Sequence, residues 1–221
     1  MNTKKTLDLD DAYALETPSD NIRLYDQWAP TYDDDFVNQV GYVYHKRVAE
    51  QLAKVKDRID GAVLDIGCGT GVVGACLHEH GLALIDGIDI STQMLTEAAK
   101  KKGSGGESVY RKLIQADLTM GTDIIDDSYA GLMSAGTFTH GHLGVEPLDE
   151  LWRIAAPGAQ CAVGVRTTHF MAAGFKEKLS ADVRDGKITA PDLIKVNLYS
   201  GGTQTTGHAN DEAFIVCCQV L

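Results

Sequence analysis

A short apolar segment that ends in a run of glycines is the feature that most restricts the fold of this chain. Residues 62–66 are almost entirely apolar and typical of a buried strand, and Gly67, Gly69 and Gly71 follow directly. Glycines let the chain turn sharply, and the helix expected over residues 71–80 then offers free N–H groups and the positive end of its dipole. The segment predicts a strand, turn and helix whose backbone approaches a nucleotide-like ligand.

Strand and helix patterns alternate along the rest of the chain. Strands are expected over residues 62–66, 83–89, 113–116, 129–134, 159–165, 194–199 and 214–220. Helices are expected over residues 22–56, 71–80, 92–102, 145–155 and 171–185, with Ser91 as the N-cap of the third. This alternation predicts an α/β fold with an open, mostly parallel, doubly wound sheet and helices on both faces. The last two strands, joined through residues 201–207, are expected to form a hairpin.

The length of 221 residues suits one α/β domain with a full hydrophobic core. No internal repeat or long low-complexity segment appears, so residues 1–221 are interpreted as a single domain. Residues 1–20 are acidic, with a break at Pro18 and Ser19, and are expected to form a loose N-terminal arm. Residues 21–60 are expected to form a helical lid.

The net charge of −11 bears on the partners of the protein. A protein that binds DNA or RNA through phosphates needs a basic face, and Lys and Arg are not concentrated into one here. No apolar run is long enough to span a bilayer, and the first residues lack the apolar stretch of a secretion signal. We therefore expect no nucleic acid, no membrane insertion and a cytoplasmic location.

The cysteines and histidines give no metal or disulfide pattern. The five cysteines contain no CxxC pair and no metal-ligand spacing, so buried, reduced thiols are expected. His140 and His142 stand close together, but a third nearby ligand with convincing spacing is lacking. We predict no metal site.

Three acidic residues follow successive predicted strands. Asp65 lies at the end of the first strand, where a carboxylate can attract an ammonium group directly or through water. Asp89 ends the second strand, where a carboxylate can accept hydrogen bonds from both hydroxyls of a ribose. Asp117 follows the third strand and can accept a hydrogen bond from an adenine amino group. Together these acids suit a ligand built on adenosine and an amino acid.

Each of these residues also has a purely structural interpretation. Asp65 alone is equally compatible with a carboxylate that caps the following helix. Tyr25, Trp28 and Tyr32 share one helical face, although Pro30 interrupts it, and such a stripe is more often plain packing than a lid over a ligand. Met94 is compatible with an apolar filler that happens to touch a ligand.

With these motifs the sequence resembles the class I methyltransferases, in particular the small-molecule group that includes the ubiquinone and menaquinone methyltransferases. The resemblance covers roughly residues 25–165 and is carried by the segments 64–71, 87–95, 116–118 and 151–159. Ala155 and Ala159 depart from the family's usual L-x-P-G-G pattern. Residues 25–33 and 134–142 are also similar to the methyltransferase-like protein 27 type (Williams–Beuren region).

The resemblance implies a Rossmann-like sheet of seven strands with an antiparallel last strand, and S-adenosyl-L-methionine as the cofactor. It implies Gly67, Gly69 and adjacent backbone around the methionine part and Asp65 toward its ammonium. It further implies Asp89 at the ribose, Ile90 and Met94 beside the adenine, and Asp117 and Leu118 at the adenine edge. The remaining residues expected to bind the cofactor are Tyr25, Trp28, Tyr32, Cys68, Gly71, Ser134 and Ala135.

The expected reaction is an in-line transfer of a methyl group to a small molecule, in which positioning and desolvation supply much of the rate. A general base is needed only if the acceptor must lose a proton. His140 is the first candidate, because it follows the fourth strand and histidine titrates near neutrality. His142, His169 and Tyr32 rank behind it, and His140 is also compatible with a turn residue that only fixes its loop.

Two other functions remain open at this point. The first is a nicotinamide-dependent oxidoreductase, since Tyr42 and Lys46 have the Tyr-x-x-x-Lys spacing of short-chain dehydrogenases. That pair precedes the glycines instead of following them, and Asp65 stands where an apolar residue or glycine is usual. The second is a cofactor-binding protein without catalysis. The sequence leaves the accepting atom open among oxygen, nitrogen, sulfur and carbon, and the protein open between monomer and homodimer.

Overall fold

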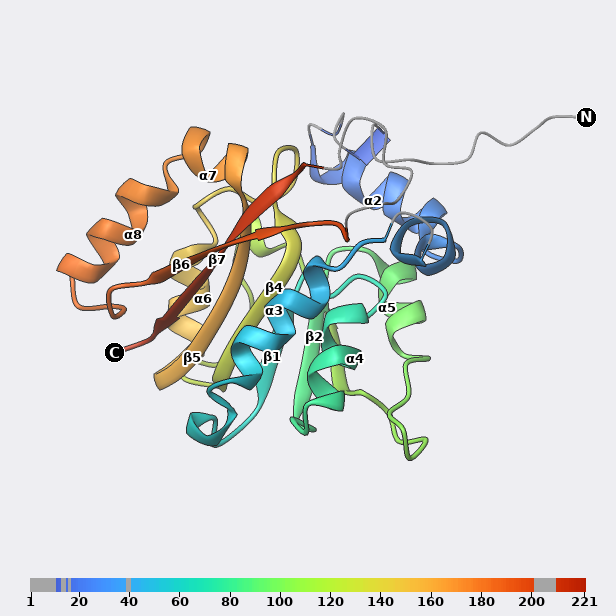
Figure 1. Cartoon of the computed structure of the whole chain (residues 1–221), viewed down its shortest axis with the longest axis horizontal. Coiled ribbons are helices and arrows are strands. Elements are labelled where there is room, and N and C mark those ends of the chain that lie inside the picture. The colour runs from blue at the N-terminus through green and yellow to red at the C-terminus, as the bar shows by residue number, and fades with distance from the viewer. Residues whose placement is uncertain (1–10, 13–14, 16, 39–40, 201–209) are drawn as a thin grey trace, which may run out of the picture.

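Seven strands form one twisted sheet at the centre of the computed structural model, which describes residues 11–12, 15, 17–38, 41–200 and 210–221 (Figure 1). The strands are β1 (Val63–Ile66), β2 (Ile85–Asp89), β3 (Tyr110–Gln115), β4 (Tyr129–Phe138), β5 (Ala155–Arg166), β6 (Asp192–Asn197) and β7 (Glu212–Gln219). Their order across the sheet is β3-β2-β1-β4-β5-β7-β6. All seven expected strands are therefore present.

The strand directions confirm the expected sheet. β1 runs parallel to β2 and β4, β3 parallel to β2, and β5 parallel to β4. β7 runs against the direction of the other six described strands and is antiparallel to both of its neighbours, β5 and β6. The chain leaves β1 toward β2 and β3 on one side and reaches β4 on the other, so the strand order reverses next to β1. In open α/β sheets, ligands bind at the carboxyl ends of the strands near such a reversal.

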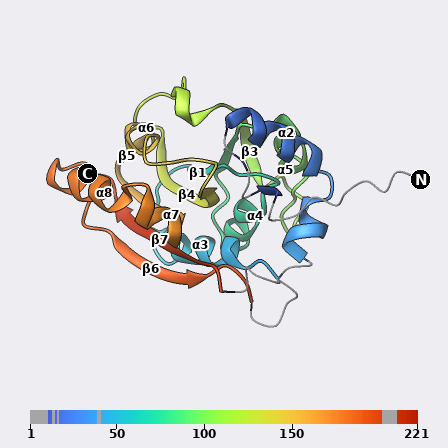
Figure 2. The ribbon, with the colours of Figure 1, turned by 90° about the horizontal axis from the view of Figure 1, so that it is seen from above.

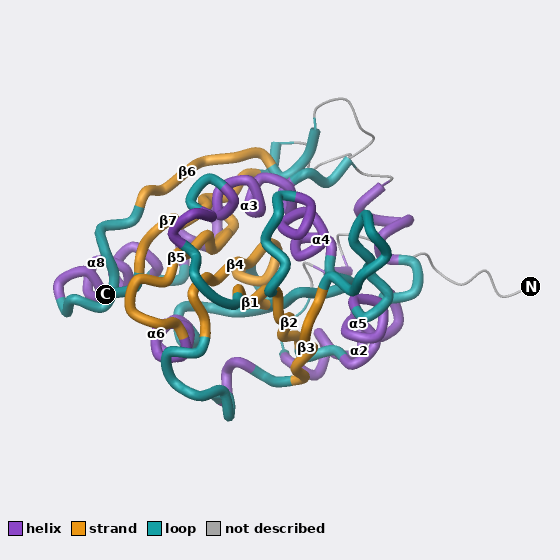
Figure 3. Tube along the Cα trace, turned by 90° about the horizontal axis from the view of Figure 1, so that it is seen from below, coloured by secondary structure: helices purple, strands orange, loops and turns teal. Residues whose placement is uncertain are grey.

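Helices cover both faces of the sheet, and two views along it show α3 and α4 on one face and α6 on the other (Figures 2 and 3). The α-helices are α2 (Pro18–Trp28), α3 (Tyr44–Ala53), α4 (Val72–Glu79), α5 (Thr92–Ala98), α6 (Leu148–Ile154), α7 (Thr167–Ala172) and α8 (Phe175–Arg184). A π-helix (Asp33–Asn38) and two short 3-10 turns (Lys56–Arg58 and Leu118–Met120) complete the described elements.

Each face of the sheet has its own hydrophobic core. One core joins α3, α4 and α5 to the sheet and includes Val48, Leu52 and Leu77. The other joins α6, α7 and α8 to the opposite face and includes Leu151 and Phe175. All four residues of β1 are buried, which is typical of a parallel strand covered on both faces.

The structure divides two segments that the sequence pattern treated as single helices. The segment 22–56 contains α2, the π-helix, α3 and a 3-10 turn, because Pro30 cannot continue the helix that ends at Trp28. The segment 171–185 is divided at Gly174, whose φ of 76° ends α7 and precedes α8. α2 begins at Pro18, within the segment expected to form the arm, while residues 201–207 lie outside the described part of the chain.

The N-terminus of α5 lies where the sequence predicted it, but its C-terminus does not. The side chain of Ser91 accepts a hydrogen bond from the Met94 N–H at 3.0 Å, so the predicted N-cap of α5 is confirmed. α5 itself ends at Ala98, four residues before the expected Lys102. Among the described residues, no helix is both long and apolar enough to cross a membrane.

Candidate functional site

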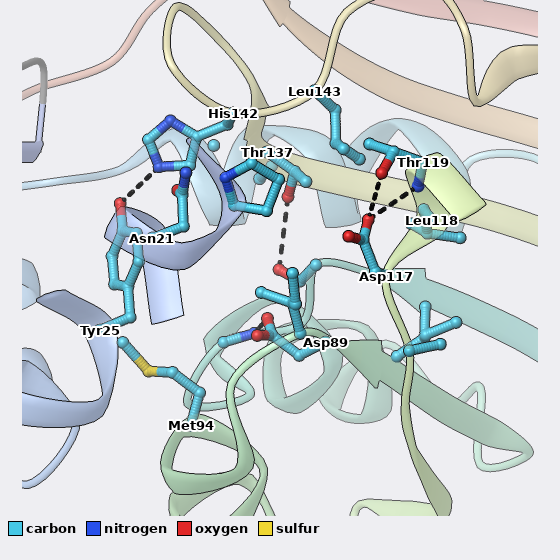
Figure 4. Close-up of a pocket in the computed structure, with 18 of the residues that line it drawn as sticks. Asn21, Tyr25, Asp89, Met94, Asp117, Leu118, Thr119, Thr137, His142 and Leu143 are labelled. Atoms are coloured by element: carbon cyan, nitrogen blue, oxygen red, sulfur yellow. Dashed lines mark hydrogen bonds between the residues drawn. The ribbon is translucent and has the colours of Figure 1, made fainter. Parts of the chain in front are cut away.

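A cavity opens at the carboxyl ends of β1, β2, β3 and β4 (Figure 4). It encloses about 850 Å³, part of which is open to solvent. Its walls come from the glycine turn after β1, the end of β2, the turn after β3, the end of β4 and the N-terminal α2. The cavity therefore lies where the reversal of strand order predicts a ligand site.

The glycine turn has the conformation that its sequence requires. Gly67, Gly69 and Gly71 have φ values of 61°, 54° and 89°, in the left-handed region that glycine adopts without strain. A Cβ on Gly67 would lie 2.1 Å from the side chain of Thr137, whereas a Cβ on Gly69 would meet no protein atom within 4 Å. Gly67 thus permits close packing, while Gly69 leaves space on the cavity wall. Cys68, between them, is buried, and α4 follows Gly71.

Asp89 joins the glycine turn to the start of α5. Its Oδ2 accepts a hydrogen bond from the Gly69 N–H at 2.8 Å, and its Oδ1 accepts one from the Ser91 N–H at 2.9 Å. Burial raises the pKa of this carboxyl, and the two N–H donors oppose that shift. Each carboxylate oxygen retains a second lone pair for a ligand. Asp89 lines the cavity, with Ile90 and Met94 beside it.

Asp117 follows the neighbouring strand β3 and is held in place by its own turn. Its Oδ1 accepts hydrogen bonds from the backbone N–H of Thr119 at 2.9 Å and from the hydroxyl of the same residue at 2.6 Å (Figure 4). Asp117, Leu118 and Thr119 all line the cavity. This Asx-type turn fixes the carboxyl at the rim and leaves Oδ2 available.

Asp65 is completely buried behind the glycine turn and is not among the residues that line the cavity. Its Oδ2 accepts hydrogen bonds from the Tyr110 hydroxyl at 2.6 Å and the Gly74 N–H at 3.0 Å. Its Oδ1 is buried and has no partner within the described part of the chain. Burial raises the pKa of Asp65 to about 7. The contact with Gly74, in α4, shows that Asp65 does bond to the following helix.

The end of β4 supplies the wall facing Asp89. Ala135, Gly136 and Thr137 line the cavity. Ser134 is fully buried instead, and its hydroxyl donates to the carbonyl of Ile66 at 2.8 Å. The Thr137 hydroxyl donates to the same carbonyl at 3.1 Å, so both side chains tie β4 to the end of β1.

Two acidic residues bind the N-terminal segment, residues 17–38, to the walls of the cavity. Asp26 accepts a hydrogen bond from the Ser91 hydroxyl at 2.6 Å, at the N-terminus of α5. Asp33 accepts one from the Thr70 hydroxyl at 2.5 Å and forms an ion pair with Lys101. The segment is thereby joined to both the glycine turn and α5.

The expected aromatic stripe contributes to both packing and the cavity. Tyr25 and Tyr32 line it, whereas Trp28, only 2% exposed, lies behind them. The ring centroids of Trp28 and Tyr32 are 5.1 Å apart, and those of Tyr25 and Trp28 are 6.3 Å apart. Tyr25, Trp28 and Tyr32 therefore form a packed aromatic cluster, and one face of this cluster lines the cavity.

Of the three candidate histidines, only His142 lines the cavity. His140 is exposed, and its carbonyl accepts a hydrogen bond from Nδ1 of His142 at 3.1 Å. Because a carbonyl only accepts, Nδ1 carries the proton, and Nε2 of His142 accepts from the Tyr25 hydroxyl at 2.9 Å. Burial lowers the pKa of His142, so the ring stays neutral near pH 7. The ring of His169 bonds to the carbonyl of Leu143 instead.

Geranyl diphosphate C-methyltransferase from Streptomyces coelicolor, solved with Mg²⁺, geranyl diphosphate and S-adenosyl-L-homocysteine, has a similar structure. The TM-score is 0.64, and the match covers 95% of this chain and 99% of that one at 12% identity. This likeness concerns the fold.

Sequence comparison finds a matching family and two similar proteins. Residues 63–158 match the methyltransferase domain family. The match covers less than half of the chain, and over these residues the sequence is similar to a methyltransferase domain. Human methyltransferase-like protein 27 is 24% identical over 164 residues, which cover 71% of this chain and 62% of that protein. An uncharacterized methyltransferase from Alkaliphilus oremlandii is 33% identical over 118 residues, which cover 51% of this chain and 54% of that protein.

The chain spans less than two thirds of the length of either of these curated relatives. The methyltransferase domain match nevertheless includes the glycine turn, Asp89 and Asp117, and it confirms the resemblance seen in the sequence. It favours a methyltransferase over the nicotinamide-dependent oxidoreductase considered above.

Two features of this site were not singled out from the sequence. Thr137 lies within the segment that resembles the family, but nothing in the pattern indicates that its side chain crosses to the glycine turn. Asn21 lines the cavity and donates from its amide to the carbonyl of Gly141 at 2.7 Å, a contact between residues 120 positions apart. Only the spacing of polar residues on α2 could have pointed to it.

Proposed function

We propose that this protein transfers a methyl group from S-adenosylmethionine to a small-molecule acceptor by in-line displacement. The observation that carries the proposal is the position of Asp89, which lines the cavity at the end of β2 and is bonded to the glycine turn. In this fold a carboxylate at that strand end accepts hydrogen bonds from ribose hydroxyls.

The cavity has the groups that such a cofactor requires. Asp89 would hold the ribose, Ile90 and Met94 would flank the adenine, and Asp117 with the backbone of Leu118 would contact the adenine edge. The space at Gly69 and the unpartnered Oδ1 of Asp65 provide an independent test of the fit. A buried carboxylate oxygen without a donor is unfavourable, and an ammonium group supplies one directly or through a water.

When bound, the cofactor supplies an electrophilic methyl group on a sulfonium. The protein's own part is to position the acceptor and exclude water. His142 is the better placed base, because its Nε2 is unprotonated and faces the cavity beside Tyr25. The Tyr25 hydroxyl can pass a proton from the acceptor to Nε2. His140 would then act through its carbonyl, which fixes the tautomer of His142.

The base role of His142 predicts a particular pH dependence. A base must be neutral to accept a proton, and burial lowers the pKa of His142 below the ordinary 6.5. We expect kcat/KM to be flat above neutrality and to fall only as the pH drops through that lowered pKa. His142→Gln should remove this acidic limb and reduce kcat by about a hundredfold. Stopped assays of methyl transfer between pH 5 and 9 measure both effects.

His169→Gln is the matched control, because His169 bonds to Leu143 and does not line the cavity. It should retain the pH profile and most of kcat. A full rate and an unchanged profile in His142→Gln would remove the residue from proton transfer.

The proposal as a whole is tested by calorimetry with S-adenosylmethionine, S-adenosylhomocysteine and NADH. We expect the first two to bind and NADH not to bind. Asp89→Asn should weaken both by about tenfold or more, since hydrogen bonds to a charged group are lost. Asp60→Asn, at an exposed position before β1, should leave them unchanged. Binding of NADH alone would contradict the proposal.

Methyl release from labelled cofactor, measured with a panel of metabolites, separates an enzyme from a protein that only binds the cofactor. We propose a small molecule as the acceptor because the net charge of −11 disfavours a polyanion.

A further inference from the structure

A second cavity adjoins the first beneath the N-terminal segment. It encloses about 540 Å³, part of which is open to solvent. Tyr25, Tyr32, Gly136 and His142 line both cavities, so these four residues form the boundary between them. A molecule in the second cavity would therefore meet the proposed base at the point where the cofactor site begins.

The walls of the second cavity are mostly aromatic. The ring centroids of Trp28 and Tyr32 are 5.1 Å apart, those of Tyr32 and Phe36 are 5.1 Å apart, and those of Phe36 and Tyr42 are 4.8 Å apart. Tyr42 lies 6.2 Å from Tyr44 by the same measure. Faces and edges of this kind suit a flat, unsaturated ring.

Three buried polar groups on these walls have no hydrogen-bond partner within the described ranges. They are Nε1 of Trp28, the hydroxyl of Tyr44 and the hydroxyl of Thr139, and the three residues are 2%, 2% and 7% exposed. Buried polar groups are normally satisfied, so this cluster indicates a bound polar partner. The indole N–H can only donate, which requires an acceptor such as a ligand oxygen.

The described residues that line the second cavity offer no unbalanced charge to a ligand. Arg166 reaches its wall but forms an ion pair with Asp211 at 2.5 Å. His142 is neutral near pH 7, because burial lowers its pKa. A charged ligand would lose its hydration without gaining a counter-ion, so an uncharged one is favoured.

From the shared boundary, the aromatic walls and the unpartnered donors, we infer that the second cavity binds the methyl acceptor, an uncharged phenol whose ring carries a further substituent that contains oxygen. This inference rests on the proposed methyltransferase function. The ring lies among the aromatic side chains, and the further oxygen accepts from Trp28 or Thr139. The phenolic hydroxyl lies at the boundary beside Tyr25 and His142.

The reaction then balances without another reactant. The phenolic O–H bond breaks, and its proton passes to Nε2 of His142. A bond forms between the oxygen and the methyl carbon while the bond from that carbon to sulfur breaks. The electron pair of the broken bond stays on sulfur, which becomes the neutral thioether of S-adenosylhomocysteine. His142 returns its proton to solvent.

The test compares three probes in assays with labelled cofactor. 4-Hydroxyacetophenone has the further oxygen, 4-ethylphenol has the same outline without it, and 4-hydroxybenzoate adds a charge. We expect kcat/KM to favour 4-hydroxyacetophenone over 4-ethylphenol by about tenfold, the contribution of one hydrogen bond to a buried donor. 4-Hydroxybenzoate should be the poorest of the three.

Trp28→Phe and Thr139→Val remove the unpartnered donors while keeping a ring or a similar outline. Each should reduce the preference for 4-hydroxyacetophenone over 4-ethylphenol several-fold, without weakening S-adenosylhomocysteine. Thr139→Val should unfold near the temperature of the parent chain, because its hydroxyl has no protein partner. Trp28→Phe should unfold at a somewhat lower temperature, because it removes part of a buried ring. Trp152→Phe is the control, since the indole of Trp152 donates to Asp182 at 3.0 Å, away from both cavities. It should keep the probe preference.

The outcomes separate this inference from the proposed function. If S-adenosylhomocysteine binds but none of the phenols is methylated, or 4-hydroxybenzoate is preferred, the acceptor class is wrong and the methyltransferase proposal stands. An unchanged preference in both variants would likewise overturn the inference. Failure of S-adenosylhomocysteine to bind would overturn the proposed function itself.

Discussion

Asp65→Asn is expected to weaken the binding of S-adenosylhomocysteine by about tenfold to a hundredfold, because a charge-assisted contact to the ammonium group is lost. 5′-Methylthioadenosine has the same nucleoside but no amino acid part, and its binding should change little. In the free protein, Oδ2 of Asp65 already bonds to Tyr110 and Gly74, and asparagine can accept both contacts. Titration calorimetry with the two ligands measures the difference.

The pKa of Asp65 adds a pH signature to this result. Its pKa of about 7 means that the free carboxyl is largely protonated at pH 6. An ammonium group favours the ionised form, so binding should release a proton and become tighter as the pH rises from 6 to 7.5. Asp65→Asn should remove the part of this release that comes from the carboxyl. Calorimetry in buffers of different ionisation enthalpy reports the protons released.

The same pKa has a consequence for folding. Because the folded pKa is raised above the ordinary 3.8, the unfolded chain loses this proton first. Stability present below about pH 4 is therefore lost as the pH rises to about 7. Asp65→Asn should lack that loss, and its unfolding temperature relative to the parent chain should increase with pH.

The role given to Asp65 would be contradicted if Asp65→Asn weakened S-adenosylhomocysteine and 5′-methylthioadenosine equally and left the release of protons unchanged.

Gly67→Ala is expected to lower the free energy of unfolding by roughly 2–4 kcal/mol, since strain and overlap act together. The φ of 61° is unfavourable for alanine, and its Cβ would lie 2.1 Å from the Thr137 hydroxyl oxygen. That change corresponds to a fall in Tm of roughly 5–15 °C for a chain of this length. Thermal and urea unfolding measure it.

Gly69→Ala is the matched control for this prediction. Gly69 has a similar φ of 54°, but its Cβ would meet no protein atom within 4 Å. We expect a cost of only about 1–2 kcal/mol from the backbone, with a loss of cofactor affinity because the methyl group enters the cavity. Equal destabilisation by the two substitutions would show that the contact with Thr137 does not limit Gly67.

The sequence predicted the sheet well because its signals are local. Apolar strands followed by glycine or aspartate repeat along the chain, and a parallel sheet brings those strand ends to one edge. The sequence alone therefore predicts that Asp89 and Asp117 lie at the edge of the sheet where the cavity opens. Pro30 and Gly174 can be read from the sequence as residues that disturb a helix. The pattern does not show whether each of them ends the helix or only bends it.

The histidines show which information the local sequence pattern does not contain. His140 and His142 are two positions apart in one loop, and the sequence pattern does not determine which ring lies toward the cavity. The choice of His142 depends on Tyr25, 117 positions away, and on the carbonyl of His140. Likewise, the complete burial of Asp65 follows from Tyr110 on β3, which packs against Gly74 of α4. Contacts of this range become visible only in three dimensions.

The contacts of Asp26 and Asp33 hold one segment of the chain against both cavities. Asp26 is fastened to α5, which bears Met94, and Asp33 is fastened to Thr70 in the glycine turn. The residues between these anchors form a wall of the second cavity. We expect that displacing this segment opens both cavities together, because its residues line both of them. Under the proposed function, release of the spent cofactor and release of the methylated product would then depend on the same two acidic contacts.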